Sequence, residues 1–171
     1  MISGDSYSDT YFNVDGGLPS PNAPMGNPPY LGSKAAGGAK WPVYLATQYN
    51  DSLIQTYNLA RSGATVDNEI MPDNRYDFVR EVRERFKPAF VAGNEDQSKW
   101  NPATALFATF FGINDNTVVL NWDNGRSEAI AEAIAQYGAL LEEVCTLVPF
   151  DHGVLLTFST SFMHSVPVTF L

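Results

Sequence analysis

The stretch Ala103-Thr-Ala-Leu-Phe-Ala-Thr-Phe-Phe111 contains no polar residue other than threonine. A strand covered on one face alternates apolar and polar residues, whereas a central parallel strand is covered on both faces and reads as a continuous apolar run. The run ends at Gly112-Ile113-Asn114-Asp115, where glycine and two polar residues are typical of a turn. We therefore expect residues 103–111 to form a central strand of a parallel sheet.

The segments around this strand alternate between helical and extended patterns. Residues 74–86 and 127–144 have apolar residues at helical spacing, and Ser127 is suited to cap the second of these helices. The expected buried stripe of that helix is Ile130, Ala133, Ile134, Tyr137, Leu141 and Val144. In residues 74–86 the arginines and glutamates are expected on the solvent face. Residues 54–59 read as another strand, Met1–Ser3 as the stub of a strand, and Trp41-Pro42 as the start of a short helix.

Strands that alternate with amphipathic helices predict βαβ units, and hence a three-layer α/β/α sandwich with a parallel sheet. In such folds the binding site lies at the carboxyl ends of the strands. Polar segments follow all three predicted strands, namely Gly4-Asp5-Ser6, the run from Ala60 to Thr65, and Gly112 to Asp115. We expect these segments to meet at one edge of the sheet. By contrast, the long Gly- and Pro-rich stretch from Tyr11 to Lys40 reads as a loop.

Composition restricts the class of partner. The 171 residues fit one domain, residues 1–171, and carry 10 Lys and Arg against 19 Asp and Glu, a net charge of -9. That charge would repel nucleic acid and anionic membrane surfaces, so neither is an expected partner. Neutral substrates such as sugars or their esters stay open, because they bind through aromatic stacking and hydrogen bonds.

Metal, disulfide and export features are not expected. Cys145 is the single cysteine, and no Cys/His cluster has zinc-site spacing. Asp5, Asp9 and Asp115 could together bind a cation, but a role in turns and caps is the favoured interpretation. Met1 leads almost directly into the Gly4-Asp5-Ser6 motif rather than through a signal peptide, and no apolar run approaches membrane-spanning length.

The three strand-end segments resemble the sequence blocks of the GDSL/SGNH hydrolases. Ser6 stands in Gly-Asp-Ser-Tyr-Ser-Asp, Gly63 in Asn-Leu-Ala-Arg-Ser-Gly-Ala-Thr, and Asn114 in Gly-Ile-Asn-Asp-Asn. The sequence around these blocks, including Asn27-Pro-Pro-Tyr30, is similar to that of the fungal acetylesterases of carbohydrate esterase family sixteen. The resemblance runs from Met1 to about Val144 and leaves residues 145–171 as a divergent tail. It implies a flavodoxin-like SGNH sandwich, a secreted parent enzyme, and an acetylated sugar or oligosaccharide substrate.

The resemblance also implies roles for these residues, and the chemistry of acyl transfer is consistent with them. Ser6 would attack the ester carbonyl as nucleophile, while its own backbone N–H, that of Gly63 and the side-chain amide of Asn114 would bind the oxyanion. No cofactor is implied. A Gly-x-Ser-x-Gly elbow is absent, because Gly4-Asp-Ser-Tyr-Ser8 lacks the second glycine, which disfavours the ordinary α/β-hydrolase fold. Trp100 and Trp122 are candidates either for stacking on sugar rings or for simple packing.

The family closes its site with a C-terminal Asp-x-x-His, in which the histidine is the general base. This sequence has none, since Pro149 precedes His152 by three positions and Ser161 precedes His164 by three. We therefore expect a fold that is incomplete at the C-terminus, although Val154 to Phe158 has the composition of a strand. Three alternatives stay open: an esterase with an unrecognised base, a catalytically silent relic, and a non-catalytic sugar-binding domain.

Overall fold

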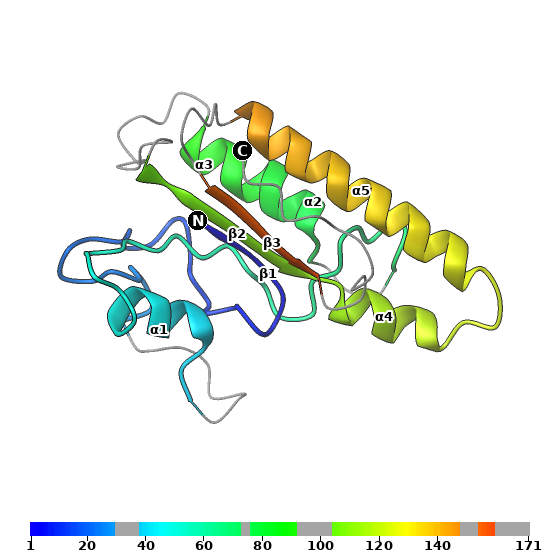
Figure 1. Cartoon of the computed structure of the whole chain (residues 1–171), viewed down its shortest axis with the longest axis horizontal. Helices are drawn as coiled ribbons and strands as arrows, with labels where there is room; N and C mark the ends of the chain where they lie inside the picture. Colours follow the sequence, from blue (N-terminus) through cyan, green and yellow to red (C-terminus); the bar gives the residue numbers. More distant parts are fainter. Residues whose placement is uncertain (30–37, 73–75, 92–103, 148–153, 160–171) are drawn as a thin grey trace.

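The structure is a computed structural model that describes residues 1–29, 38–72, 76–91, 104–147 and 154–159. Its sheet has three parallel strands in the order β1 (Ile2–Gly4), β2 (Leu106–Phe111) and β3 (Val154–Ser159) (Figure 1). Ile2 lies opposite Ala108, and Leu106 lies opposite Val154. The apolar run thus forms the middle strand of the described sheet, and the chain has an α/β fold with a parallel sheet, as predicted.

A further extended segment, residues 57–61, lies along the other side of β1, and we call it the edge segment. The Ile2 N–H donates to the Tyr57 carbonyl at 2.9 Å, and the Leu59 N–H donates to the Ile2 carbonyl at 2.7 Å. The pairing is parallel, but only the bridge between Ile2 and Asn58 is regular. The residues that pair are therefore 57–61, a few positions later than the predicted strand at 54–59.

This order places a topological switch point beside β1. From β1 the chain goes outward to the edge segment and then returns across β1 to form β2 on its other side. Connections that leave in opposite directions open a crevice at the carboxyl ends of the two strands, which is where ligands bind in open α/β sheets. Ser6 and Asn114 follow these two strand ends.

Two long helical segments cover one face of the sheet (Figure 1). The first consists of α2 (Phe78–Arg80), the π-helical η2 (Glu81–Phe86) and α3 (Lys87–Phe90), and the second is α5 (Arg126–Leu147). Aromatic rings join the layers, with ring centroids 4.7 Å apart for Phe78 and Phe111. The buried hydrophobic side chains of this layer and of β2 include Phe78, Val82, Phe86, Phe90, Phe107, Phe111, Ala133, Tyr137, Leu140 and Val144.

The helices differ from their predicted forms in three respects. Ser127 lies inside α5 and bonds the Glu128 side chain, so the predicted Ser127 cap is wrong; Gly125, whose carbonyl accepts the Ala129 N–H at 3.0 Å, precedes the helix instead. The buried stripe of α5 is Ala129, Ala133, Tyr137, Leu140 and Val144, whereas Ile134 is 37% exposed. In the other helix Glu81 is buried, although the pattern placed its glutamates in solvent.

The opposite face of the sheet meets α1 (Trp41–Thr47), whose Leu45 lines a cavity together with Ile2 and Ala108. Helix α4 (Ile113–Leu120) follows β2 directly at the carboxyl edge. Residues 11–29 and 38–40, the described parts of the predicted loop, contain turns and bends and a single bridge, between Ser20 and Ala23. Helices therefore lie on both sides of the sheet, and the polar strand ends emerge between them.

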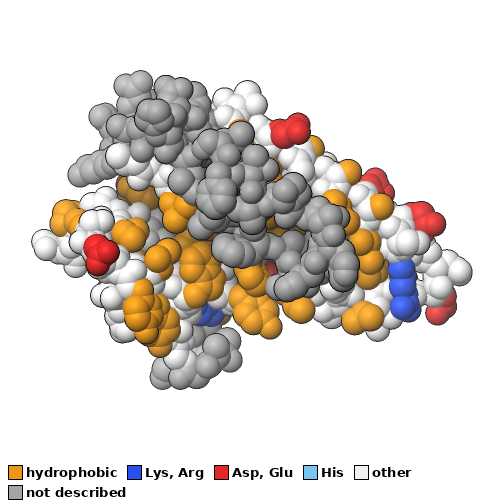
Figure 2. Space-filling view, in the orientation of Figure 1, with side chains coloured by type: hydrophobic (Ala, Val, Ile, Leu, Met, Phe, Trp, Pro, Cys, Tyr) orange, Lys and Arg blue, Asp and Glu red, His pale blue; other side chains and the backbone are white. Residues whose placement is uncertain are grey.

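Charged side chains on the face seen in Figure 2 gather mainly along α5. The exposed acidic residues of that helix include Glu128, Glu132 and Glu142. Within the described ranges no helix is both long and apolar enough to cross a bilayer.

Candidate active site

Ser6 lies in a single tight turn directly after β1. The Ser8 and Asp9 N–H groups both donate to the Asp5 carbonyl at 3.0 Å, and the Tyr7 N–H donates to Asp5 Oδ1 at 2.9 Å. Asp5 is fully buried, whereas Ser6 is half-buried and so reaches solvent. The Ser6 backbone N–H donates to no described residue, because the hydrogen bonds of the turn use the N–H groups of the three residues that follow it, Tyr7 to Asp9. The turn thus presents the hydroxyl and one unoccupied N–H together.

Gly63 lies in the loop that follows the edge segment, and it has a positive φ of 83°. Only glycine adopts this left-handed conformation without a steric cost. The Ala64 N–H donates to the Arg61 carbonyl at 3.1 Å, while the Gly63 N–H donates to no described residue. A second backbone N–H is therefore unoccupied, on the loop adjacent to the Ser6 turn.

Asn114 lies in the first turn of α4, directly after Gly112 and Ile113. Its Nδ2 donates to the Ala64 carbonyl at 2.8 Å, so it bonds the residue next to Gly63. A side-chain amide carries two N–H donors, and this bond uses one of them. Asn114 is half-buried rather than turned into the core, which leaves its second donor for a ligand.

Hydrogen bonds tie the three segments together in pairs. The Asp5 N–H donates to the Phe110 carbonyl at 3.3 Å, which joins the ends of β1 and β2. Asp115 Oδ1 accepts the Val66 N–H at 2.9 Å, which joins α4 to the Gly63 loop. The structure therefore brings the Ser6, Gly63 and Asn114 segments to one edge of the sheet. Their catalytic roles stay predictions.

Asp9 is a residue whose importance the sequence did not reveal. It is 1% exposed, and its Oδ2 accepts both the backbone N–H and the hydroxyl of Ser62, next to Gly63. Its Oδ1 accepts the Tyr11 N–H at 2.7 Å and lies 3.6 Å from the Arg61 guanidinium. The second aspartate of Gly-Asp-Ser-Tyr-Ser-Asp was the available signal, and it was assigned only to a turn.

Two buried carboxyl groups and a buried amine lie behind the Ser6 turn. The pKa of Asp5 is raised to about 6, mainly by burial and also by the nearby Asp115, while the Tyr7 N–H and Lys40 act in the opposite direction. Burial also raises the pKa of Asp115. Among the described residues, Asp5 Oδ2, Asp115 Oδ2 and Lys40 Nζ have no hydrogen-bond partner. The site is therefore backed by a compact group of ionisable side chains.

This group does not form a metal site in the described part of the chain, where no cluster of three or more His, Cys, Asp or Glu side chains has the required geometry. The aspartates instead accept backbone N–H groups, those of Tyr7, Tyr11 and Val66. The turn and capping interpretation therefore describes their contacts.

The remaining candidates are placed as follows. Trp122 is half-buried and packs against the hydrophobic core, in agreement with the packing alternative. Trp100, His152 and His164 lie outside the described residues. Tyr7, which follows Ser6 directly, is 57% exposed, and Tyr11, at the start of the predicted loop, is 51% exposed.

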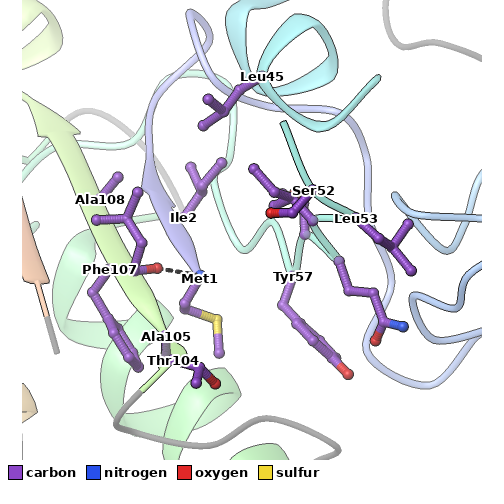
Figure 3. Close-up of a pocket in the computed structure, with 14 residues that line it drawn as sticks. Met1, Ile2, Leu45, Ser52, Leu53, Tyr57, Thr104, Ala105, Phe107 and Ala108 are labelled. Carbon is purple, nitrogen blue, oxygen red and sulfur yellow. Dashed lines mark hydrogen bonds between the residues drawn. The ribbon is translucent and has the colours of Figure 1, made fainter. Parts of the chain in front are cut away.

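A cavity of about 450 Å³ lies at the other end of the strands. Met1 and Ile2 of the β1 start, Phe107 and Ala108 of β2, and Leu45 of α1 contribute to its wall (Figure 3). Neither Ser6, Gly63 nor Asn114 lines it. Because the chemistry-bearing segments lie at the carboxyl ends of the strands, this cavity is separate from the candidate site.

Comparison with known proteins agrees with this arrangement. Residues 1–161 match the profile of the family described as GDSL-like Lipase/Acylhydrolase. The chain is 34% identical over 142 residues to a protein named acetylesterase from Thermothelomyces thermophilus, an alignment that covers 81% of this chain and 46% of that protein. The chain thus spans about half the length of this curated relative. No solved structure matches the chain significantly.

Proposed function

The chain belongs to the GDSL-like lipase/acylhydrolase family, and from this membership we propose that its Ser6 is the nucleophile in the hydrolysis of small carboxylic esters. The observation that carries the proposal is the pair of unoccupied backbone N–H groups at Ser6 and Gly63, with the Asn114 amide bonded beside them. Donors held in place before the reaction bind an oxyanion without a reorganisation cost.

In the proposed reaction Ser6 Oγ attacks the ester carbonyl carbon and transfers its proton to a general base. The carbonyl oxygen becomes an oxyanion, which accepts hydrogen bonds from the Ser6 and Gly63 N–H groups and from the free Asn114 N–H. Collapse of this intermediate expels the alcohol, which receives the proton from the base. Water then hydrolyses the acyl-Ser6 intermediate by the same steps, and the carboxylic acid is released.

The described residues contain no histidine that could act as the general base. By the family resemblance it would be the histidine of an Asp-x-x-His, a pattern that this sequence does not contain. His152 and His164 are the histidines of the chain. The proposal therefore assigns the nucleophile and the oxyanion donors to the described part, and assigns proton transfer to a group outside it.

We propose acetyl esters, carried by a carbohydrate, as the substrate class, and a secreted setting for the protein. The name of the similar acetylesterase supports the acetyl group. The exposed ring of Tyr7 beside Ser6 offers an apolar face for the sugar of the leaving alcohol. A net charge of -9 favours a neutral ester and the departure of the acetate product.

The test is the hydrolysis of an acetylated oligosaccharide by the chain itself and by the chain fused to a segment that carries Asp-x-x-His from a related acetylesterase. We expect hydrolysis barely above background for the chain alone, because loss of a triad member costs on the order of 10⁴-fold. The fusion should restore turnover, Ser6→Ala should abolish it, and Asn114→Ala should lower kcat by about 10²-fold.

The exposed ring of Tyr7 beside Ser6 also favours a second candidate, a chain that binds acetylated sugar without hydrolysing it. Sugar binding without hydrolysis by the fusion would support it and contradict the esterase proposal. Enzyme-like turnover by the unmodified chain, lost on His152→Ala or His164→Ala, would instead show that one of these histidines is the base.

A further inference from the structure

The hydrogen bonds between β1 and the edge segment are interrupted at one position. In a regular parallel ladder, the bonds that Ile2 makes with Tyr57 and Leu59 would be followed by a bond from the Gly4 N–H to the Leu59 carbonyl. The Gly4 N–H donates instead to Oε2 of Glu81 at 3.1 Å, and the Leu59 carbonyl accepts Arg85 Nη1 at 2.6 Å. Two side chains of η2 therefore replace both halves of one ladder bond.

The ladder resumes immediately beyond this gap. The Arg61 N–H donates to the Gly4 carbonyl at 2.8 Å, in the register that the earlier bonds set. On its other side Gly4 lies beside β2, where an added Cβ would lie 2.7 Å from the Phe110 carbonyl oxygen. The pairing of β1 with the edge segment therefore departs from a regular ladder at Gly4 and Leu59, where Glu81 and Arg85 bond.

This arrangement is costly in free energy. Glu81 is 1% exposed, its Oε1 has no partner among the described residues, and burial raises its pKa well above the ordinary value. The Gly4 N–H, the charges of Arg85 and Arg61, and the nearby Ser3 side chain oppose that rise. A direct backbone bond between Gly4 and Leu59 would need no buried charge. Stability alone therefore does not explain why the two side chains occupy this gap.

Arg85 is held at the gap by a second contact. Its Nη2 donates to the Phe12 carbonyl at 3.1 Å, and Arg61 Nη2 donates to the same carbonyl at 2.6 Å. Glu81 and Arg85 both belong to the π-helical segment η2, in which the Lys87 N–H donates to the Val82 carbonyl five residues back. Single π-helical turns within α-helices are frequent at functional sites.

The interrupted bond lies a few residues before the candidate oxyanion donors on both segments. Gly4 precedes Ser6 by two residues, and Leu59 precedes Gly63 by four. We propose that Glu81 and Arg85 are a positioning pair, which keeps Gly4 and Leu59 out of direct backbone pairing and thereby sets the relative position of the Ser6 and Gly63 N–H groups. The inference rests on the proposed function of those N–H groups.

The test follows the backbone amide resonances of Ser6 and Gly63 by NMR in the double variant Glu81→Met/Arg85→Met. We expect this variant to fold, because apolar residues of similar size often replace buried ionisable side chains without loss of stability. The Gly4 N–H should then bond the Leu59 carbonyl, and both resonances should shift. Glu81→Gln, which keeps an acceptor oxygen for Gly4, should leave them close to the parent positions.

The matched control is Arg83→Met/Glu84→Met on the exposed face of the same helix, which should leave both resonances unchanged. A folded Glu81→Met/Arg85→Met variant with unshifted Ser6 and Gly63 resonances would overturn the inference. If that variant does not fold, Arg85→Met alone tests the inference. The Leu59 carbonyl then loses its partner, and both resonances must still shift.

Kinetics separate this inference from the proposed function. In the Asp-x-x-His fusion, the double variant should lower kcat on an acetyl ester by on the order of 10²-fold and leave KM unchanged, since a small misplacement of catalytic donors has an effect of that size. A fusion of the parent chain without any turnover would contradict the esterase proposal. The amide resonances would still decide whether Glu81 and Arg85 set the relative position of the two N–H groups.

Discussion

Asp9 accepts the backbone N–H of Ser62 at 2.8 Å through the same oxygen, Oδ2, that accepts the Ser62 hydroxyl at 2.9 Å. Asp9 also belongs to the turn that carries Ser6, because its own N–H donates to the Asp5 carbonyl. Ser62 directly precedes Gly63. One buried carboxylate therefore joins the nucleophile turn to the loop that carries the second proposed oxyanion donor.

Replacement of Asp9 should affect both stability and catalysis. We expect Asp9→Ala to lower the free energy of unfolding by on the order of 3 kcal/mol, because hydrogen bonds to a buried charged group are lost. Asp9→Asn should cost less, since one acceptor oxygen remains. Urea unfolding measures the change, with Asp15→Ala in an exposed part of the same loop as control. Equal stability of Asp9→Ala and the control would show that the link contributes nothing.

Asp5 should make stability depend on pH with an unusual sign. Its pKa in the folded chain is about 6, against 3.8 for the free group, so protonation favours the folded state. This contribution is fully present below about pH 4 and is lost as the pH rises through about 6. Asp5→Asn, which mimics the protonated form, should therefore be more stable than the parent at pH 7, by on the order of 1–3 kcal/mol.

The comparison requires melting curves of parent and Asp5→Asn at pH 4 and pH 7. The advantage of the variant should vanish at the lower pH. Asp51→Asn, at an exposed site, controls for the change in net charge. An advantage that is equal at both pH values would mean that Asp5 keeps an ordinary pKa in the folded chain.

The hydroxyl groups of Thr109 and Tyr137 bond each other in the core between β2 and α5, and both residues are buried. Tyr137→Phe should lower the free energy of unfolding by about 1–2 kcal/mol, because the Thr109 hydroxyl is left without its partner. The double variant Thr109→Val/Tyr137→Phe removes both polar groups and should recover part of that loss. Chemical denaturation of the four proteins of this cycle measures the coupling, and strictly additive effects would argue against the bond.

The parallel sheet and the three site segments could be predicted because they depend on local chemistry. The run from Ala103 to Phe111 is apolar enough to favour a central strand, and its residues Leu106–Phe111 form β2 between β1 and β3. Ser6 and Asn114 follow strands, so the common direction of β1 and β2 brings them to one edge. The pairing between β1 and the edge segment could not be predicted in detail, because side chains from η2 replace one regular ladder bond there.

Glu81 shows most clearly what the pattern could not reveal. The run Glu81-Val-Arg-Glu-Arg85 has the polar character of a solvent face, and periodicity alone does not identify which charged residue turns inward. That depends on an acceptor requirement at Gly4, 77 residues away, and on the π-helical turn. The prediction of a Ser127 cap was wrong for a more local reason, because α5 begins at Arg126, directly after Gly125 with its φ of 78°.

The π-helical turn also restricts how the gene can change in length. An α-helix advances by about 100° per residue, so deletion of one codon between Glu81 and Phe86 would rotate everything after it by that amount. Glu81 could then no longer face Gly4 while Phe86 and Phe90 remain in the core, where both are buried. Descendants of this sequence can exchange side chains in the helix more readily than they can shorten it, whereas insertions at the exposed Gly16 and Gly17 would disturb neither contact.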